Sequence, residues 1–483
     1  MECSSFALSV AAETSKIQLK GTKSQTLDQI LSLDEQDIDI ATAALILSSE
    51  GSKKLLGGAV DISKYQKKLD DIAKALSEKL GNESSPDKIV EIMNDFIYKD
   101  EKYIFDKTDK EIKTPENAFL NCVLENKKGN CLGLSILYLS LAERLGIPLR
   151  GAATPIHVFV RFEKSPINLN IETTDNGKRY DNELYRKIYH SPQSSKFYLR
   201  SLTKKKVISL FLTSLATFYM DKGLYEDSTK AFEKAIEISP DNMTARNNLA
   251  LLHYNERRYD QAWLEYDKIL EETPDLYNAI NNRGMVLLKK GHLKEAGEAF
   301  QKALELYPRY LIGRYNYGLY YMANKQEDEA IFEFKNAIAI DPNFVAAHIN
   351  LGVVYKDKGL QKESMQEFQE ALLINPRSEE ALTNLGNVQM AKYQFNEAIT
   401  TLKKVIEINP KNATAYNNLA VAYFLINDQP LAMLHLAKAL QFGYPVNPKF
   451  LNAVAAKQKA QRVEASERSI DSYYEELGIK KNK

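Results

Sequence analysis

Residues 128–135 read KGNCLGLS, which places Cys131 directly after Gly-Asn and at the start of a long apolar segment. Leucine and isoleucine fill many positions from 132 to 145, which predicts a helix that is buried on most of its surface and is stopped by Gly146. The free N–H groups and the positive dipole end of a helix N-terminus stabilise a thiolate and a developing oxyanion. Cys131 is therefore a candidate nucleophile, whereas Cys122 is interpreted as a small buried apolar residue.

A thiolate nucleophile needs a base and an acid that orients the base. In residues 153–162, ATPIHVFVRF, apolar side chains alternate, which predicts a strand with His157 on the face opposite to the valines. Residues 167–177, INLNIETTDNG, predict a second strand and a turn. Glu172 follows His157 by 15 residues, which is the right separation for a neighbouring antiparallel strand. We therefore expect Cys131, His157 and Glu172 to meet as nucleophile, base and acid.

The order of these residues, a cysteine on a helix followed by a histidine and an acid on two strands, resembles the arrangement in papain and in transglutaminases. The block 118–162 includes NCVLENKKGNCLGLSILYLSLAERLGIPLRG and ends in PIHVFVRF. It is similar to the SirB1 N-terminal, transglutaminase-like family, and the resemblance extends over about 38–190. It implies an α+β papain/transglutaminase-like domain. Members of that family often carry tetratricopeptide repeats after this domain.

The resemblance also implies roles for individual residues. Cys131 matches the nucleophile, His157 the base, and Glu172 the position that an aspartate usually holds in this family. Glu172 is one methylene longer than aspartate, and Asp175 is a rival for the role of the acid. The single tryptophan of the chain, Trp263, lies outside this domain, so we expect no tryptophan to assist the transition state. Many members of the family replace the cysteine, whereas this chain keeps it.

The second half of the chain repeats every 34 residues. Each unit holds two segments with apolar residues at helical spacing, and a proline ends the second segment. In the first segment a small residue such as Gly352 lets the partner helix approach, and in the second Ala330, Phe334 and Ala337 share one face. These features resemble tetratricopeptide repeats and imply an all-α superhelix of seven repeats over 209–446. The repeating prolines are Pro240, Pro274, Pro308, Pro342, Pro376 and Pro410.

An asparagine recurs with the same period in the first helix of six units. Stacked repeats would align these amides as a ladder along the inner face, where each offers a donor and an acceptor to the backbone of an extended peptide. Similar ladders in other tetratricopeptide superhelices bind peptides in this way, so the expected partner is a protein or a peptide. The alternative is that each asparagine bonds the neighbouring repeat and only stabilises the stack. The residues are Asn248, Asn282, Asn316, Asn350, Asn384 and Asn418.

These patterns divide the chain into five segments. Residues 1–37 are expected to form a leader or a flexible arm, 38–202 the transglutaminase-like domain and 209–446 the seven repeats. Residues 447–465 are expected to form a capping helix with a polar outer face, which an open stack of repeats requires. Residues 466–483 are expected to form a frayed tail.

The amino-acid composition limits which binding partners and which cellular compartment we expect for this chain. Lys plus Arg and Asp plus Glu both number 64, so the net charge is zero and nothing favours a nucleic acid or an anionic membrane as partner. No apolar run is long enough to span a bilayer. Three cysteines without a CxxC pair fit neither a disulfide framework nor a metal site, so we expect no metal, no other cofactor and a cytoplasmic location. The alternative location is the cell envelope, if the apolar N-terminal stretch is the end of a signal peptide.

Two functions remain open. In the first, the Cys131 thiolate attacks a carboxamide or peptide carbonyl, the acyl group is released to water or an amine, and the repeats bring the protein substrate. In the second, the chain is a catalytically inactive protein–protein interaction scaffold in which the repeats carry the function. The presence of both Cys131 and His157 favours the first function, whereas the unusual acid and the missing tryptophan favour the second.

Overall fold

The chain divides into two compact units, Met1–Tyr307 and Pro308–Lys483. Residues 1–25 of the predicted arm, 460–465 of the predicted capping helix and the whole predicted tail lie outside the described residues. The computed structural model describes residues 26–109, 113–163, 169–457 and 459.

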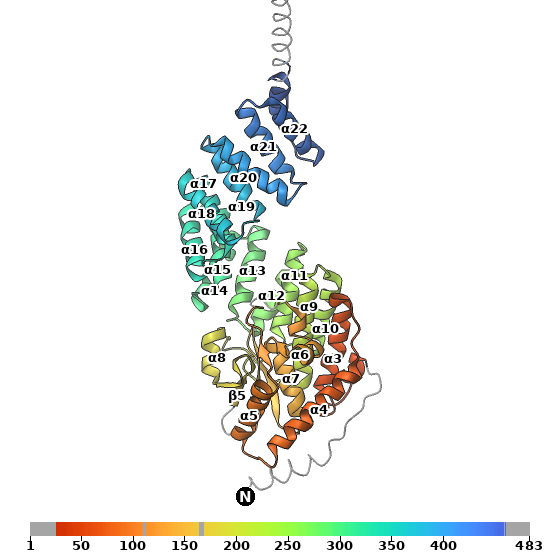
Figure 1. Ribbon diagram of the computed structural model, residues 1–483. Helices are drawn as coiled ribbons and strands as arrows, with labels where there is room; N and C mark the ends of the chain where they lie inside the picture. The colour runs from red at the N-terminus through yellow and green to blue at the C-terminus, as the bar shows by residue number, and fades with distance from the viewer. Residues whose placement is uncertain (1–25, 110–112, 164–168, 458, 460–483) are drawn as a thin grey trace, which may run out of the picture. The chain divides into compact units, whose positions relative to one another are not determined.

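The N-terminal part of the first unit consists of helices that pack around its core (Figure 1). The Thr26 side chain caps the first of them by accepting a hydrogen bond from the Gln29 N–H. Ile30 and Ile38 both bury their side chains in the core, so the arm predicted over 1–37 is too long. The elements are α2 (Leu27–Leu31), α3 (Ile40–Gly51), α4 (Ile62–Leu80), α5 (Pro86–Asn94), α6 (Leu120–Asn126), the π-helical turns η2 (Ser52–Leu56) and η3 (Asp95–Asp100), and the short 3-10 turn η4 (Pro115–Asn117).

A long apolar helix runs through this core. In α7 (Cys131–Arg144) every residue from Cys131 to Ala142 is buried, as the run of leucines predicts. Beyond its end Gly146 has a φ of 65°, the left-handed backbone conformation that commonly terminates helices. The prediction of a buried helix that begins at Cys131 is therefore confirmed.

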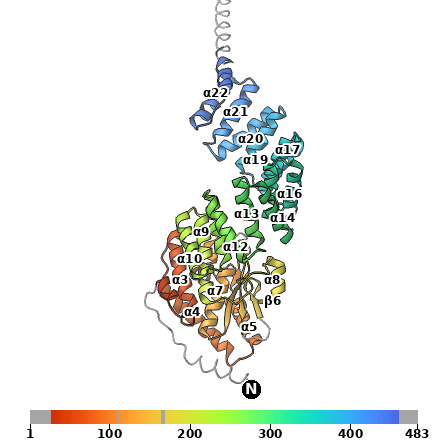
Figure 2. The same ribbon diagram turned by 180° about the vertical axis from the view of Figure 1, so that it is seen from behind.

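A four-stranded antiparallel sheet in the order β3-β4-β5-β6 lies between α7 and α8 (Figures 1 and 2). On one face, Val160, Phe162 and Ile171 belong to the same core as α7. On the other face, Phe159 stacks on Tyr185 of α8, with ring centroids 3.9 Å apart. The elements are β3 (Leu149–Ala153), β4 (Val158–Phe162), β5 (Leu169–Glu172), η5 (Thr173–Asp175), β6 (Lys178–Tyr180) and α8 (Asn182–Tyr189), with a separate parallel pair, β1 (Ile104–Phe105) and β2 (Lys128–Gly129).

Seven helix pairs follow the sheet, as the 34-residue period predicts, three in the first unit and four in the second. A Cβ atom at Gly352 would lie 2.7 Å from the Phe368 ring, and one at Gly318 would lie 2.6 Å from the Phe334 ring. The small residue therefore does permit the close approach of the two helices of a unit. The pairs are α9 (Lys204–Asp221) and α10 (Tyr225–Ile238), α11 (Met243–Asn255) and α12 (Tyr259–Glu272), α13 (Tyr277–Lys290) and α14 (Leu293–Leu306), α15 (Leu311–Ala323) and α16 (Glu327–Ile340), α17 (Val345–Asp357) and α18 (Gln361–Ile374), α19 (Glu379–Ala391) and α20 (Phe395–Ile408), and α21 (Ala413–Leu425) and α22 (Gln429–Gln441).

The first repeat helix belongs to the core of the domain that precedes it. The Leu202 N–H donates to the Gly151 carbonyl at 2.8 Å, which adds a bridge to the sheet just before α9 begins. Phe211 of α9 stacks on Phe119, with ring centroids 6.3 Å apart. The boundary predicted after residue 202 is therefore not a boundary between compact units, and the division lies after Tyr307.

The predicted capping segment is helical over residues 448–457. Val454 is buried in the same core as Leu419 and Leu436 of the seventh helix pair, and the Gln429 side chain donates a hydrogen bond to the Val454 carbonyl. This contact covers the apolar end of the last repeat, as a cap must.

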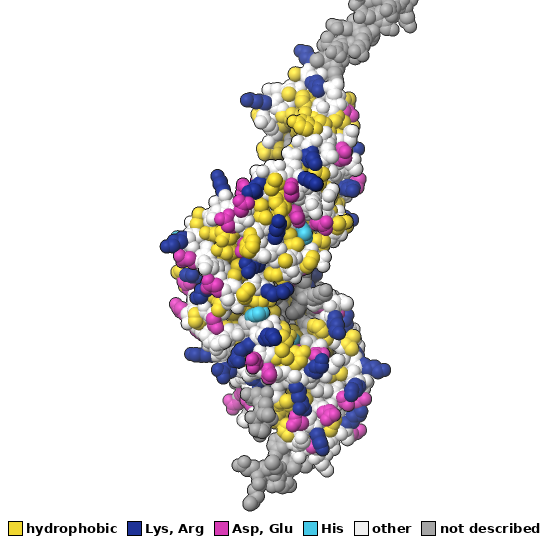
Figure 3. Space-filling model, turned by 90° about the vertical axis from the view of Figure 1, so that its left-hand side faces the viewer, with side chains coloured by type: hydrophobic (Ala, Val, Ile, Leu, Met, Phe, Trp, Pro, Cys, Tyr) yellow, Lys and Arg dark blue, Asp and Glu magenta, His cyan; other side chains and the backbone are white. Residues whose placement is uncertain are grey.

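Charged side chains of both signs are interspersed over the face of the molecule shown in Figure 3. This distribution agrees with the balanced composition of 64 basic and 64 acidic residues. Within the part of the chain that the structure describes, no helix is long and apolar enough to cross a membrane. The same residues contain no cluster of at least three His, Cys, Asp or Glu side chains that could bind a metal.

Candidate active site

Cys131 is the first residue of α7, and the segment before it is held by hydrogen bonds. The Asn130 side chain accepts a hydrogen bond from the Gly133 N–H at 2.9 Å, which caps the helix. The Asn130 N–H donates to the Asn117 carbonyl at 2.8 Å. A Cβ at Gly133 would lie 2.3 Å from that same carbonyl oxygen, so only glycine permits this approach. These contacts fix the helix tip and the cysteine on it.

Asn117 is itself positioned by two carboxylates. Its amide nitrogen donates to Asp106 and to Asp109, each at 2.9 Å. Lys128, at the start of the segment that leads to Cys131, pairs with Asp106 at 2.8 Å. Polar contacts therefore extend outward from the helix tip over two layers of side chains.

His157 lies in the tight turn that joins β3 to β4. The Thr154 N–H donates to the His157 carbonyl at 2.8 Å and closes this turn. The single strand predicted over 153–162 is therefore wrong in its first half, because Ala153 ends β3 and β4 starts only at Val158. The predicted facing of the histidine is confirmed, since its ring contacts α8, on the side of the sheet away from Val160.

Glu172 lies at the end of β5, and its carboxylate faces the histidine. Val160 of β4 pairs with Ile171 of β5 in antiparallel register, as predicted from the sequence separation. Continuing that register places Glu172 opposite Phe159, on the sheet face that His157 also uses. The distance between His157 Nε2 and Glu172 Oε2 is 2.7 Å. Nε2 is thus engaged with the acid, and the His157 side chain also makes a hydrogen bond with the Cys131 thiol.

The electrostatics of the three side chains favour a charge-separated pair. Burial is the largest single influence on Cys131 and would raise its pKa, but the hydrogen bond and charge of His157 and a bond from the Val158 N–H lower it below the ordinary thiol value. Burial alone would lower the pKa of His157, but its contacts with Cys131 and Glu172 raise it to about 10. The pKa of Glu172 is lowered, because hydrogen bonds from His157 and Thr174 outweigh burial. The arrangement thus shifts the three groups toward a thiolate, an imidazolium and a carboxylate.

Asp175, the rival acid, lies elsewhere. Its carboxylate pairs with Lys178 at 2.9 Å and accepts a hydrogen bond from the Tyr180 hydroxyl at 3.0 Å. The structure thus brings Glu172, and not Asp175, to the imidazole.

Two tyrosines of α8 complete the surroundings of the histidine and were not identified from the sequence. Tyr189 stacks on the His157 ring, with centroids 4.6 Å apart and planes inclined by 7°. The Tyr185 hydroxyl donates to Glu172 at 2.9 Å. Buried Arg161 braces the helix, because its guanidinium donates to the Asn182 side chain at 2.7 Å. A flat aromatic ring therefore covers the imidazole without a tryptophan.

Cys131 and His157 border a cavity of about 280 Å³. Residues of the β3–β4 turn, such as Thr154 and Ile156, form part of its wall. Ile156 is 60% exposed, so the rim next to the histidine is accessible from outside. The cavity leaves space beside Cys131 and His157, which are themselves 8% and 7% exposed.

The asparagine ladder makes contacts between repeats in both units. In the first unit the Asn248 amide donates to Thr217 at 3.3 Å, and the Asn282 amide donates to Asn247 at 3.2 Å. In the second unit the Asn350 amide donates to the Tyr315 hydroxyl at 3.0 Å, and the Asn418 amide donates to Asn387 at 2.7 Å. These are the stack-stabilising bonds of the alternative interpretation. The remaining two, Asn316 and Asn384, are buried and half-buried respectively.

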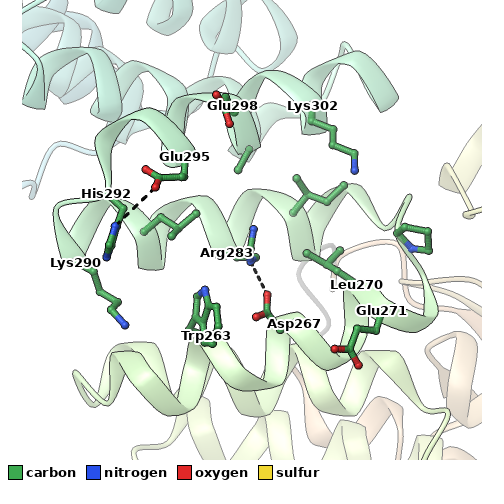
Figure 4. Close-up of a pocket in the computed structure, with 14 residues that line it drawn as sticks. Trp263, Asp267, Leu270, Glu271, Arg283, Lys290, His292, Glu295, Glu298 and Lys302 are labelled. Carbon is green, nitrogen blue, oxygen red and sulfur yellow. Dashed lines mark hydrogen bonds and ion pairs between the residues drawn. The ribbon is translucent and has the colours of Figure 1, made fainter.

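A second cavity, of about 820 Å³, lies among α12, α13 and α14 (Figure 4). Its lining is rich in charge: Arg283 pairs with Asp267 at 2.8 Å, and the Arg283 guanidinium lies 5.9 Å from the centre of the Trp263 ring. His292 approaches Glu295 at 3.9 Å. None of the described residues that line this cavity is a cysteine, serine or threonine, so it offers no hydroxyl or thiol nucleophile.

Comparisons with known protein families match both halves of the chain. Residues 63–212 match the transglutaminase-like superfamily. The chain therefore consists of a transglutaminase-like α+β domain followed by an all-helical superhelix of tetratricopeptide repeats, which confirms the predicted fold class. The repeat matches cover residues 218–256, 277–310, 318–359, 345–378 and 391–427.

Two curated relatives are UPF0162 proteins of Xylella fastidiosa. The protein of strain 9a5c is 23% identical over 165 residues, which cover 32% of this chain and 59% of the relative. The protein of strain Temecula1 is 33% identical over 87 residues, which cover 17% of this chain and 31% of the relative. The chain thus spans less than two thirds of the length of either relative.

Similar solved structures include tetratricopeptide repeat proteins. The crystal structure of YrrB, described as a TPR protein with an unusual peptide-binding site, is 26% identical with a TM-score of 0.32 and covers 39% of this chain and 96% of that one. PilF of Pseudomonas aeruginosa is 19% identical with a TM-score of 0.41 and covers 44% of this chain and 97% of that one.

Proposed function

We propose that this chain is a thiol-dependent acyl-transfer enzyme whose repeats bind a protein or peptide substrate. The observation that carries the proposal is the 2.7 Å contact between His157 Nε2 and Glu172 Oε2 beside Cys131 at a helix tip. The acid orients the imidazole so that its other nitrogen serves the thiol. The raised pKa of His157 and the lowered pKa of Cys131 then supply a thiolate and a proton donor together at neutral pH.

The reaction proceeds in two halves. The Cys131 thiolate attacks the carbonyl carbon of a carboxamide or a peptide bond, and the N–H groups of Cys131 and Leu132 at the start of α7 stabilise the oxyanion. The His157 imidazolium gives its proton to the leaving nitrogen, the C–N bond breaks, and a thioester remains on Cys131. Neutral His157 then takes a proton from water or from an incoming amine, which attacks the thioester. The C–S bond breaks, and a carboxylic acid or a new amide leaves with the thiolate restored.

The surroundings of His157 support the charged form on which this reaction depends. The Tyr189 ring lies flat against the imidazole and covers one of its faces. An aromatic face attracts a cation, so this contact stabilises the imidazolium as well as its orientation.

Membership of the SirB1 family and a cytoplasmic location are part of the same proposal. The resemblance of residues 118–162 to the SirB1 family supports the family membership. The second is supported by Cys122 and Cys131, which are both free thiols and would need a reducing compartment to stay so.

The test is the rate at which iodoacetamide alkylates Cys131 as a function of pH, followed by peptide mass spectrometry. The full chain with Cys3 and Cys122 replaced by serine leaves one thiol to follow. We expect fast alkylation below pH 7 and a loss of roughly 10- to 100-fold in His157→Gln, since each pKa unit changes the thiolate fraction tenfold. His292→Gln, a change at a histidine of the repeats, is the matched control and should leave the rate unaltered.

A slow reaction with a midpoint near the ordinary thiol pKa of about 8.5 would overturn the proposal. So would equal rates in the wild type and in His157→Gln. The chain would then be better studied as an inactive scaffold in which the repeats carry the function.

A further inference from the structure

The cavity in front of Cys131 is built by two parts of the first unit. The transglutaminase-like domain supplies the helix tip and the β3–β4 turn on one side. The opposite wall consists of side chains from the first three repeats, among them Leu210, Ser214 and Phe218 of α9 and Met243 of α11. The candidate nucleophile therefore faces repeat helices across the cavity.

Hydrogen bonds fix the distance between the two walls. The Thr244 hydroxyl on α11 donates to the Pro155 carbonyl at 3.3 Å, in the turn that carries His157. The same hydroxyl lies 2.9 Å from the Tyr198 hydroxyl, which belongs to the segment between the sheet and α9. The repeat wall is thus attached directly to the strand connection that positions the base.

The lining of this cavity carries little charge. Apart from Cys131 and His157, none of the described residues that line it is Asp, Glu, Lys, Arg or His. The larger cavity among α12, α13 and α14 shows that this is not a general property of the repeats, since both acidic and basic side chains line it (Figure 4). An uncharged wall disfavours charged groups, because its hydroxyl and amide groups offer hydrogen bonds but no opposite charge in exchange for their hydration.

The size of the cavity suits one large side chain and the adjoining peptide unit. Its volume of about 280 Å³ is close to twice the ~150 Å³ that accepts benzene in an engineered apolar cavity. The apolar wall residues Leu210, Phe218 and Met243 are each no more than 6% exposed, so the core packs against them on the side away from the cavity. Asn248 is half-buried beside them and uses one amide N–H on Thr217, which leaves its second N–H for a backbone carbonyl.

We propose that the first repeats form the substrate-specificity wall of the active site, which accepts an uncharged, mainly apolar side chain next to the carbonyl that Cys131 attacks. Leu210, Phe218 and Met243 contact that side chain, Ser214 lies at its rim, and Asn248 binds the adjoining backbone. This inference rests on the proposed function, and it makes the first asparagine of the ladder a substrate contact.

The test uses electrophiles that carry different side chains. N-acetyl-leucyl, N-acetyl-aspartyl and N-acetyl-lysyl chloromethyl ketones each react with a thiolate by forming a C–S bond and releasing chloride. We measure their rates on Cys131 of the full chain and divide each by the rate with iodoacetamide, which carries no side chain. The leucyl reagent should exceed both charged reagents by about tenfold, a usual discrimination for an apolar pocket.

Two variants of Ser214 make the test specific to the wall. Ser214→Phe fills the cavity and should lower the leucyl-to-iodoacetamide ratio about tenfold. Ser214→Lys adds a cation at the rim and should raise the aspartyl-to-iodoacetamide ratio several-fold, a gain that misfolding cannot produce. Thr400→Phe, on the exposed surface of α20, is the matched control and should leave every ratio unchanged.

The outcomes separate this inference from the proposed function. If the three chloromethyl ketones gave equal ratios, and both Ser214 variants left these ratios unchanged, the specificity wall would be overturned. The proposed thiolate would still stand in that case, provided that iodoacetamide alkylates Cys131 fast. Slow alkylation by iodoacetamide itself would overturn the proposed function, and the inference with it.

Discussion

The acid of the candidate site is a glutamate, and its longer side chain is held in place by its neighbours. Thr174 donates to Glu172 Oε1 from its backbone N–H at 2.9 Å and from its hydroxyl at 2.6 Å. Tyr185 donates to the other oxygen, the one that contacts His157. Three hydrogen-bond donors hold this carboxylate in one position, so the extra methylene of glutamate adds little freedom of movement. The replacement of the usual aspartate by Glu172 therefore does not by itself argue against a working site.

We expect Glu172→Gln to lower the rate of Cys131 alkylation at pH 7 by about tenfold. The amide can no longer stabilise the imidazolium, so the pKa of His157 falls and the thiolate loses its partner. In the wild type the rate falls only as the pH drops through the lowered pKa of Cys131, whereas in the variant the fall begins at higher pH. The measurement is a pH profile of iodoacetamide alkylation.

Asp175→Asn provides the control for this profile, because that carboxylate bonds Lys178 and Tyr180 instead of the imidazole. The assignment of the acid would be wrong if Asp175→Asn shifted the profile as far as Glu172→Gln does.

How far the sequence predicts single residues depends on how local their signals are. Cys131, His157 and Glu172 could be identified because a helix start and an antiparallel register leave a clear spacing. Tyr189 could not, because its stacking on His157 depends on how α8 folds back over the sheet. No sequence pattern predicts that α8 packs back onto the sheet.

At the scale of elements, the repeats depend on a contact between a small residue on the first helix and a large one on the second. The position of Gly352 is taken by alanine in the first, second and seventh repeats, as Ala216, Ala250 and Ala420, which correspond to the facing residues Phe232, Tyr266 and Leu436. In those repeats the two helices are spaced for a methyl group, whereas in the fifth repeat the Phe368 ring takes the space that a Cβ at Gly352 would fill.

We therefore expect Gly352→Ala to lower the free energy of unfolding by about 1–2 kcal/mol. Overpacking against the Phe368 ring, 2.7 Å from the added Cβ, outweighs the helix propensity that alanine gains. Urea denaturation of the full chain measures the change. In the Phe368→Leu background the same substitution should cost clearly less, and an equal cost in both backgrounds would show that the ring is not responsible.

Several repeats also share a cation that ties their two helices to the preceding turn. Arg314 donates to the Pro308 carbonyl at 3.1 Å and pairs with Glu333 at 2.9 Å. Arg246 makes the equivalent contacts with Pro240 and Glu265. In the fifth repeat a histidine takes this place: His348 contacts the Pro342 carbonyl at 3.1 Å and Glu367 at 2.7 Å.

The histidine makes this contact dependent on pH. The pKa of His348 is raised, chiefly by its hydrogen bond with Glu367, so the protonated form stabilises the folded state. That stabilisation is complete below the unfolded pKa of about 6.5 and is lost as the pH rises through the folded value. Relative to His348→Arg, which stays charged, the wild type should lose about 1 kcal/mol of unfolding free energy between pH 6 and pH 9. Urea denaturation of both proteins at the two pH values measures this, and a constant difference would contradict it.

At the scale of the whole molecule, the sequence predicts the two fold types well but not where the compact units divide. The 34-residue period marks the repeats clearly, and the change of pattern near residue 202 suggests a boundary there. The change of pattern marks a change from strands to helices, but the packing of the core continues across it. Phe211 and Leu215 of α9 bury their side chains in the core of the preceding domain, which periodicity alone cannot reveal.

A chain that ends after residue 202 should therefore fail to fold, whereas one that ends after Tyr307 should fold and keep its thiol chemistry. Removing α9 strips several large apolar side chains from the core, each worth about 1.5–3 kcal/mol, and the total approaches the whole stability of a domain, about 5–15 kcal/mol. The cavity beside Cys131 would also lose its repeat wall. Thermal unfolding tests both chains, and the longer one should alkylate Cys131 at the rate of the full chain. If the shorter chain unfolds cooperatively and alkylates Cys131 equally fast, the domain folds without the repeats and the core that it shares with α9 is not essential to it.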